Sequence, residues 1–166
     1  MTDLSPGHAA SNSVAHPILL YDGVCGLCNR LVQFILRRDP GAVFRFASLQ
    51  SPLASRILAR HGADAADLDT VYVVINCDQP DEQLLPRSDA VIFILGHLGE
   101  AAVAAQGTPT SGSSFWRVAG LLLQLVPRRA RDWGYRMVAK TRYRIFGRYD
   151  ACPLPSEETR WRFLDQ

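Results

Sequence analysis

The sequence lacks any apolar run long enough to cross a lipid bilayer. Its longest nearly uninterrupted apolar segment, VAGLLLQLV, covers only residues 118–126, whereas a transmembrane helix needs about 20 residues. Residues 1–16 are polar and have neither a basic start nor an apolar centre, so they do not predict a secretory signal. We therefore expect a cytoplasmic chain without a membrane-spanning segment, and a disordered lead-in over residues 1–16.

Cysteine and histidine are also scarce, with four of each among 166 residues. No two histidines have the spacing of metal ligands, and in a reducing cytoplasm four cysteines do not predict a structural disulfide framework. Two of the cysteines, Cys25 and Cys28, form a CxxC pair. In such a compartment a closely spaced pair indicates redox or metal chemistry.

The net charge is only +2, but it is unevenly distributed. Residues 128–148 hold eight basic side chains and one acidic side chain, a net charge of +7, so the rest of the chain carries −5. We interpret this segment as an arginine-rich helix that packs Trp133, Met137 and Val138 against the domain and leaves most arginines in solvent. It has no nucleic-acid-binding motif, so no nucleic acid is expected as a partner. A weak contact with a membrane surface is the alternative that its charge leaves open.

Apolar periodicity and turn residues predict alternating strands and helices. Strands are expected at residues 18–21, 43–47, 70–75 and 82–85. Helices are expected from the cysteines to 38, from 52 to 61, from 88 to Gly96 or Gly99, and over 115–125, 129–143 and 157–164. A flexible loop is expected over 106–114. A helix between neighbouring strands implies a parallel pair, and the short turn between the last two strands implies an antiparallel one.

This order of elements predicts an α/β protein. A CxxC pair between the first strand and the first helix is typical of a thioredoxin-like fold. We expect a β-α-β-α-β-β-α core over residues 17–104, with strands 18–21 and 71–75 central in the sheet. A helical C-terminal extension over residues 115–166 is expected to pack on this core.

The position of the pair at a helix start predicts its chemistry. Unpaired N–H groups and the positive end of the helix dipole lower the pKa of a cysteine there. Cys25 would then be a partly exposed nucleophilic thiolate, Cys28 would face inward as the resolving thiol, and Gly26 would let a partner's backbone approach. The alternatives are half of a zinc site, completed by Cys77 and Cys152, or two inert core thiols.

Three motifs, in order along the chain, resemble those of the DCC family of predicted thiol–disulfide oxidoreductases. They are YDGVCGLCN at residues 21–29, RSDAV at 87–91 and YRIFGRYDACP at 143–153. The resemblance implies a thioredoxin-like fold and disulfide exchange. No organic cofactor is implied, because the dithiol is itself the redox centre. The expected partners are protein or small-molecule thiols and disulfides, together with a cellular dithiol reductant such as thioredoxin.

The resemblance also suggests site residues. Asp22 matches the family's acid and would either relay the proton of Cys28 or only cap the turn. Arg87 and Ser88 are candidates to lie near the pair, against the simpler expectation that Ser88 caps a helix and Arg87 faces solvent. Cys152 would be a third redox thiol or a brace for the tail. Thioredoxins have a cis-proline just before the third strand, but no proline precedes Val71 here, so we expect trans peptide bonds there.

Overall fold

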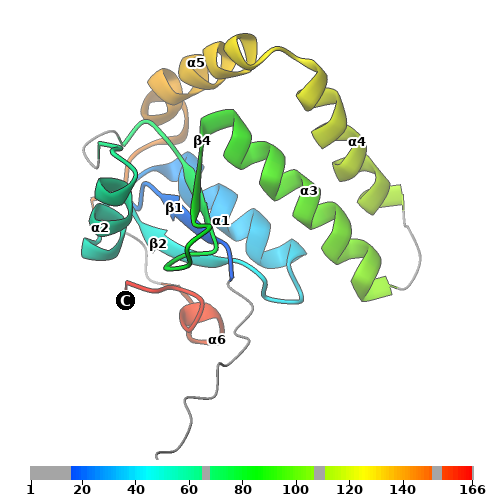
Figure 1. Ribbon diagram of the computed structural model, residues 1–166, viewed down its shortest axis with the longest axis horizontal. Helices are drawn as coiled ribbons and strands as arrows, with labels where there is room; N and C mark the ends of the chain where they lie inside the picture. Colours follow the sequence, from blue (N-terminus) through cyan, green and yellow to red (C-terminus); the bar gives the residue numbers. More distant parts are fainter. Residues whose placement is uncertain (1–15, 65–67, 107–110, 151–154, 166) are drawn as a thin grey trace, which may run out of the picture.

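A four-stranded mixed sheet organises the protein, with the strands in the order β2-β1-β3-β4 (Figure 1). The computed structural model describes residues 16–64, 68–106, 111–150 and 155–165. The elements are β1 (Ile18–Tyr21), α1 (Gly26–Arg38), β2 (Arg45–Ser48), α2 (Pro52–Arg60), β3 (Tyr72–Ile75), β4 (Gln83–Pro86), α3 (Arg87–Gln106), α4 (Ser111–Leu125), α5 (Arg128–Phe146) and α6 (Glu157–Arg160).

The strand pairing confirms the predicted order of elements and its thioredoxin-like α/β class. β1 pairs in parallel with β2, so that Ile18 lies opposite Arg45, and α1 forms the crossover between them. β3 pairs antiparallel with β1 on one side and with β4 on the other. β1 and β3 are therefore the central strands, as expected. The described residues contain no cis peptide bond, so the bonds before Val71 are trans.

Helices cover both faces of the sheet because the central strands are apolar on both sides. Alternate residues of a strand point to opposite faces. Leu19 and Tyr21 of β1 join the core beneath α1 and α3, whereas Ile18 and Leu20 join the core beneath α2. Full burial of one such side chain contributes about 1.5–3 kcal/mol. This double burial fixes β1 rigidly, and with it the loop that carries Cys25.

The helices α3 and α4 are longer than expected. α3 does not end at Gly96 or Gly99 but continues to Gln106, and α4 begins at Ser111 within the expected loop. A mid-helix glycine costs only about 1 kcal/mol relative to alanine, so tertiary packing can override it. Here α4 packs along α3: a Cβ added to Gly120 would lie 3.7 Å from the Cβ of Leu95.

The face of α5 that packs on the core is not the expected one. Trp133 is 63% exposed and Met137 and Val138 are half-exposed, whereas Ala139 and Arg142 are buried. The small Ala139 lets α5 lie close to α1 and α3, and Arg142 meets carboxylates beneath the helix. The apolar prediction failed because an arginine with carboxylate partners occupies the buried face, which hydrophobicity alone does not indicate.

The chain end covers the outer edge of β2 instead of extending a helix to residue 164. α6 ends at Arg160, and the backbone of Phe46 then exchanges hydrogen bonds with Arg162 and Leu164. The Arg162 guanidinium contacts the Asp39 carboxylate in the interior. Residues 1–15, most of the predicted lead-in, lie outside the described residues. In the described part of the chain, no helix is long and apolar enough to cross a membrane.

Candidate functional site

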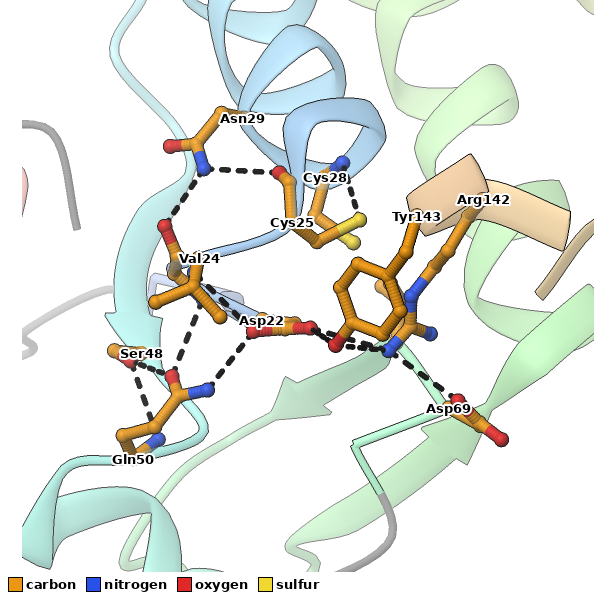
Figure 2. Close-up of polar contacts among 12 residues, drawn as sticks. Asp22, Val24, Cys25, Cys28, Asn29, Ser48, Gln50, Asp69, Arg142 and Tyr143 are labelled. Atoms are coloured by element: carbon orange, nitrogen blue, oxygen red, sulfur yellow. Dashed lines mark hydrogen bonds and ion pairs between the residues drawn. The ribbon is translucent and has the colours of Figure 1, made fainter. Parts of the chain in front are cut away.

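Cys25 and Cys28 lie where β1 gives way to α1, as the sequence predicted. Cys25 is the N-cap of α1, with extended backbone angles (φ −83°, ψ 122°), and its Sγ accepts a hydrogen bond from the Cys28 N–H at 3.4 Å. The Asn29 side chain holds the turn in place by donating to the carbonyls of Gly23 and Cys25 (Figure 2). The sulfur of Cys25 therefore occupies the position at which a helix stabilises an anion.

The surroundings separate the acidities of the two thiols. A hydrogen bond from the Cys28 thiol lowers the pKa of Cys25 to about 6, helped by the Cys28 and Leu27 amides and by the positive Arg142, and opposed by burial. The same thiol hydrogen bond and burial raise the pKa of Cys28 well above its usual range. At pH 7 Cys25 is then mostly thiolate, while Cys28 keeps its proton.

Cys25 is more deeply buried than the sequence suggested. It is 0% exposed and Cys28 is 5% exposed, whereas we expected Cys25 to be partly accessible. The cover is the segment of residues 146–149, which we call the strap. Its Gly147 carbonyl accepts from the Gly26 N–H at 3.1 Å, and the Tyr149 N–H donates to the Val24 carbonyl at 2.8 Å. The strap comes from the end of α5, so a distant part of the chain closes the site.

Gly26 has a steric role, but its close neighbour is the protein itself. A Cβ at this position would lie 2.1 Å from the carbonyl oxygen of Phe146. That separation is far below any van der Waals contact, so only glycine fits under the strap. The expected approach of a partner's backbone to Gly26 is therefore replaced by the approach of residues 146 and 147.

Asp22 is completely buried beside the pair and receives several hydrogen bonds. Its carboxylate accepts from Arg142 Nη2 at 3.1 Å, from Gln50 Nε2 at 2.8 Å, from the Tyr143 hydroxyl and from the Val24 N–H at 3.2 Å (Figure 2). The bond to Val24 is the predicted turn contact. The ion pair with Arg142 was not predicted, and it couples the start of α1 to α5.

Arg142 is the main site residue that sequence reasoning missed. It is 3% exposed, and besides Asp22 its Nη2 contacts Asp69 Oδ1 at 3.3 Å. Its positive charge lowers the pKa of both thiols. Arg142 and Tyr143 lie at the edge of the third motif, but the basic composition of that segment indicated solvent. Asp22 could have indicated them, because an acid at the end of a buried strand needs a partner to compensate its charge, and no partner is evident nearby in the sequence.

A mostly apolar cavity of about 280 Å³ opens onto Cys28. Its walls come from α1, α3, α5 and Val71, which directly precedes β3, and they include Leu31, Val91 and Val138. Its polar lining residues are Tyr135, whose hydroxyl accepts from the Val71 N–H at 2.8 Å, and Arg142. Ligand sites commonly combine apolar walls with a few polar groups in this way. Cys28, and not Cys25, lines the cavity.

The remaining candidates are dispersed. The buried Ser88 hydroxyl donates to Asp132 at 2.6 Å and so ties α3 to α5, and Arg87 lines a hollow with His61 on the side of α2. Neither makes a hydrogen bond to the cysteines within the described residues. Cys77 packs on the α2 face of the sheet, whereas Cys25 and Cys28 are on the other face. Cys152 lies outside the described residues, so its predicted role as a third redox thiol or a brace for the tail stays a prediction.

A family comparison covers the part of the chain that contains this site. Residues 19–148, which include Asp22, the CxxC pair, Arg142 and the strap up to its third residue, match the family described as DCC1-like thiol-disulfide oxidoreductase. The chain belongs to this family. It is 36% identical over 154 residues to the uncharacterized protein YuxK of Bacillus subtilis (strain 168), covering 93% of this chain and 98% of YuxK.

A plant member of the family is similar over a shorter length. The chain is 34% identical over 138 residues to the chloroplastic DCC family protein At1g52590 of Arabidopsis thaliana, which covers 83% of this chain and 69% of the plant protein. No solved structure matches the chain. Family membership and the thiol pair thus rest on sequence, whereas the surroundings of the pair are set by the folded structure.

Proposed function

We propose that this protein is a thiol–disulfide oxidoreductase that exchanges disulfides through Cys25 and Cys28. The observation that carries the proposal is the opposite direction of the two pKa shifts at one helix start: lowered for Cys25 and raised for Cys28. A nucleophile that is ionised at neutral pH beside a protonated thiol is what two-step exchange requires. Family membership supports the same reaction class.

In the reducing direction, the Cys25 thiolate attacks one sulfur of a substrate disulfide. A mixed disulfide forms on Cys25, and the other half of the substrate leaves as a thiolate. Cys28 then loses its proton, attacks Cys25 Sγ and releases the second half. The Cys25–Cys28 pair is oxidised to a disulfide, and the substrate is reduced to one thiol, which takes the Cys28 proton, and one thiolate. A cellular dithiol restores the reduced pair.

Asp22 and Arg142 act as positioning residues in this proposal. The Asp22 carboxylate already accepts four hydrogen bonds, and no hydrogen bond joins it to either sulfur within the described residues. We therefore assign it the task of holding Arg142 beside the thiols, where the guanidinium stabilises whichever sulfur is anionic. This role replaces the proton relay that the sequence left open.

In this scheme the substrate enters through the cavity beside Cys28, and its sulfur passes Cys28 to reach the covered Cys25. The strap covers Cys25, whereas the 280 Å³ cavity reaches Cys28 and has apolar walls. Disulfides that carry an apolar group next to sulfur fit this entrance better than strongly charged ones. The zinc alternative is less well supported, because the sheet separates Cys77 from the pair.

The test uses dithiodipyridine, an apolar aromatic disulfide whose released thione absorbs light. The reference chain carries Cys77→Ser and Cys152→Ser, so that only the CxxC pair can react. It should release two thiones and end with a Cys25–Cys28 disulfide. Adding Cys28→Ser should release one thione and leave a stable mixed disulfide on Cys25, detected by mass spectrometry. Adding Cys25→Ser should leave only slow reaction.

A rapid mixed disulfide on Cys28 in the Cys25→Ser chain would reverse the assigned roles. If both thiols were inert until a chelator removed one equivalent of zinc, a metal-binding module would replace the redox proposal. Catalysis itself is measured as faster reduction of a protein disulfide by dithiothreitol in the presence of the reference chain. That acceleration should disappear with Cys25→Ser.

A further inference from the structure

α4 exposes a continuous apolar stripe on its outer side. Leu125 is 79% exposed, and Phe115, Val118, Leu121 and Leu122 are each more than half exposed. The spacing of residues 118, 121, 122 and 125 places these side chains on one helical face, opposite the side that packs on α3. Scattered single apolar residues on a surface are ordinary, but a contiguous group of this kind marks an interaction surface.

α5 continues this surface with a different pattern. Its outward side has an apolar flank of Met137, Val138 and Ile145, which are exposed by half or more. Its other flank is basic and carries the exposed Trp133 in its midst. The members of the basic flank are Arg129, Arg136, Lys140 and Arg144. We call these outward residues of α4 and α5 the α4–α5 surface.

The basic residues of α5 divide into two groups according to their partners. On the inward side, Arg128 and Arg131 pair with Asp89, and Arg142 pairs with Asp22. The four residues of the basic flank form no ion pair with any part of the chain that the structure describes. The acidic body therefore neutralises only part of the +7 excess of this segment, and four positive charges face outward beside apolar side chains.

We propose that the α4–α5 surface binds the surface of an anionic lipid bilayer. A helix with one apolar flank and one basic flank that carries a tryptophan lies in the interface of such a membrane. Each basic residue near anionic headgroups strengthens binding about fivefold. The chain would lie on the bilayer without crossing it, in accord with the lack of a spanning helix in its described part.

A second copy of the chain fits this surface less well. A two-fold interface places the same patch on both sides, so the four unpaired positive charges of each copy would meet like charges. Anionic headgroups supply the opposite charge next to an apolar layer, which accounts for both flanks at once. The charge pattern therefore favours a lipid surface.

The α4–α5 surface borders the cavity that leads to the thiol pair. Val138 and Gly134 of α5 line the cavity together with Cys28, and Val138 is also half-exposed on the apolar flank. Docking would bring the entrance of the cavity close to the bilayer. The binding itself does not depend on disulfide exchange, so the lipid proposal stands or falls separately from the proposed reaction.

Binding is measured with the reduced full chain by co-sedimentation with vesicles of phosphatidylcholine and phosphatidylglycerol. The double variant Arg136→Gln/Lys140→Gln should bind about 25-fold more weakly, from two charges at about fivefold each. The control Arg37→Gln/Arg56→Gln removes the same charge from exposed positions on α1 and α2 and should bind like the parent chain. All four side chains are exposed, so these variants should fold normally.

The apolar contribution to binding is tested by Trp133→Ser/Met137→Ser, which should weaken binding about tenfold or more. High salt should also weaken binding of the parent chain, and dithiodipyridine reactivity without vesicles should be unchanged in every variant. Equal binding to pure phosphatidylcholine, or equal weakening by the control pair, would overturn the proposal. The proposal would also be overturned if the chain did not bind vesicles and formed a dimer in ultracentrifugation that Trp133→Ser dissociates. The surface would then join two copies of the chain.

Discussion

The ion pair between Asp22 and Arg142 offers the sharpest test of how the extension and the thiol site depend on each other. Both side chains are almost completely buried, and they are 120 residues apart in sequence. Removing one partner of a buried pair leaves an uncompensated charge, which typically costs about 3–5 kcal/mol. In Arg142→Gln, Asp22 keeps its bonds to Tyr143, Gln50 and Val24. We therefore expect a loss near the lower end, about 3 kcal/mol.

The double variant Asp22→Asn/Arg142→Gln removes both charges and should restore part of that loss. Its cost should be smaller than the sum of the two single costs by about 1–3 kcal/mol, because residues in one buried network are coupled. The assay is urea unfolding of the reduced chain, followed by circular dichroism. Arg136→Gln, an exposed change on the same helix, is the matched control and should cost less than about 0.5 kcal/mol.

A second measurement separates electrostatics from packing. The Arg142 charge lowers the pKa of Cys25, so Arg142→Gln should shift the pH profile of Cys25 alkylation to higher pH, whereas Arg136→Gln should not. Strictly additive unfolding energies would refute the coupling of the pair. An unchanged alkylation profile in a folded Arg142→Gln chain would refute the effect of Arg142 on the thiolate.

Two further predictions concern the thiols and their cover. The alkylation rate of Cys25 should rise with pH about a midpoint near pH 6. The free energy of unfolding of the reduced chain should increase from about pH 6 to about pH 8.5, because over this range Cys25 is ionised in the folded chain but still holds its proton in the unfolded chain. Above about pH 8.5 the stability should fall again, because folded Cys28 retains a proton that the unfolded chain loses. The measurement is urea unfolding at a series of pH values, with Cys25→Ser as the control. A free energy of unfolding that did not change with pH would contradict this prediction. Gly26→Ala places a Cβ 2.1 Å from the Phe146 carbonyl oxygen, and this clash outweighs the helix preference for alanine of about 1 kcal/mol. The variant should be less stable by about 1–3 kcal/mol and alkylate faster at Cys25 as the strap is displaced, whereas an unchanged rate would mean that the strap does not limit access.

Local sequence determined the order of the elements along the chain and the place of the thiol pair. The apolar residues of β1, the cap at Ser51 with Pro52, and the turn after Tyr21 were enough to predict a strand, helix starts and a cysteine at the beginning of α1. These features depend on neighbours within a few residues, through capping and side-chain periodicity. The predicted central strands and the parallel β1–β2 pair followed from them and are confirmed.

Tertiary structure decided what surrounds the pair. Whether Cys25 is exposed depends on Gly147 and Tyr149, and which face of α5 is buried depends on Asp22 and Asp69. Hydrophobicity assigns an arginine to solvent, because burying one is costly unless a carboxylate compensates for its lost hydration. That compensation comes from residues far away in the chain, so no local pattern contains it. The sequence supplied the two thiols in the right place, and the folded extension supplied the cover and the charge that set their acidity.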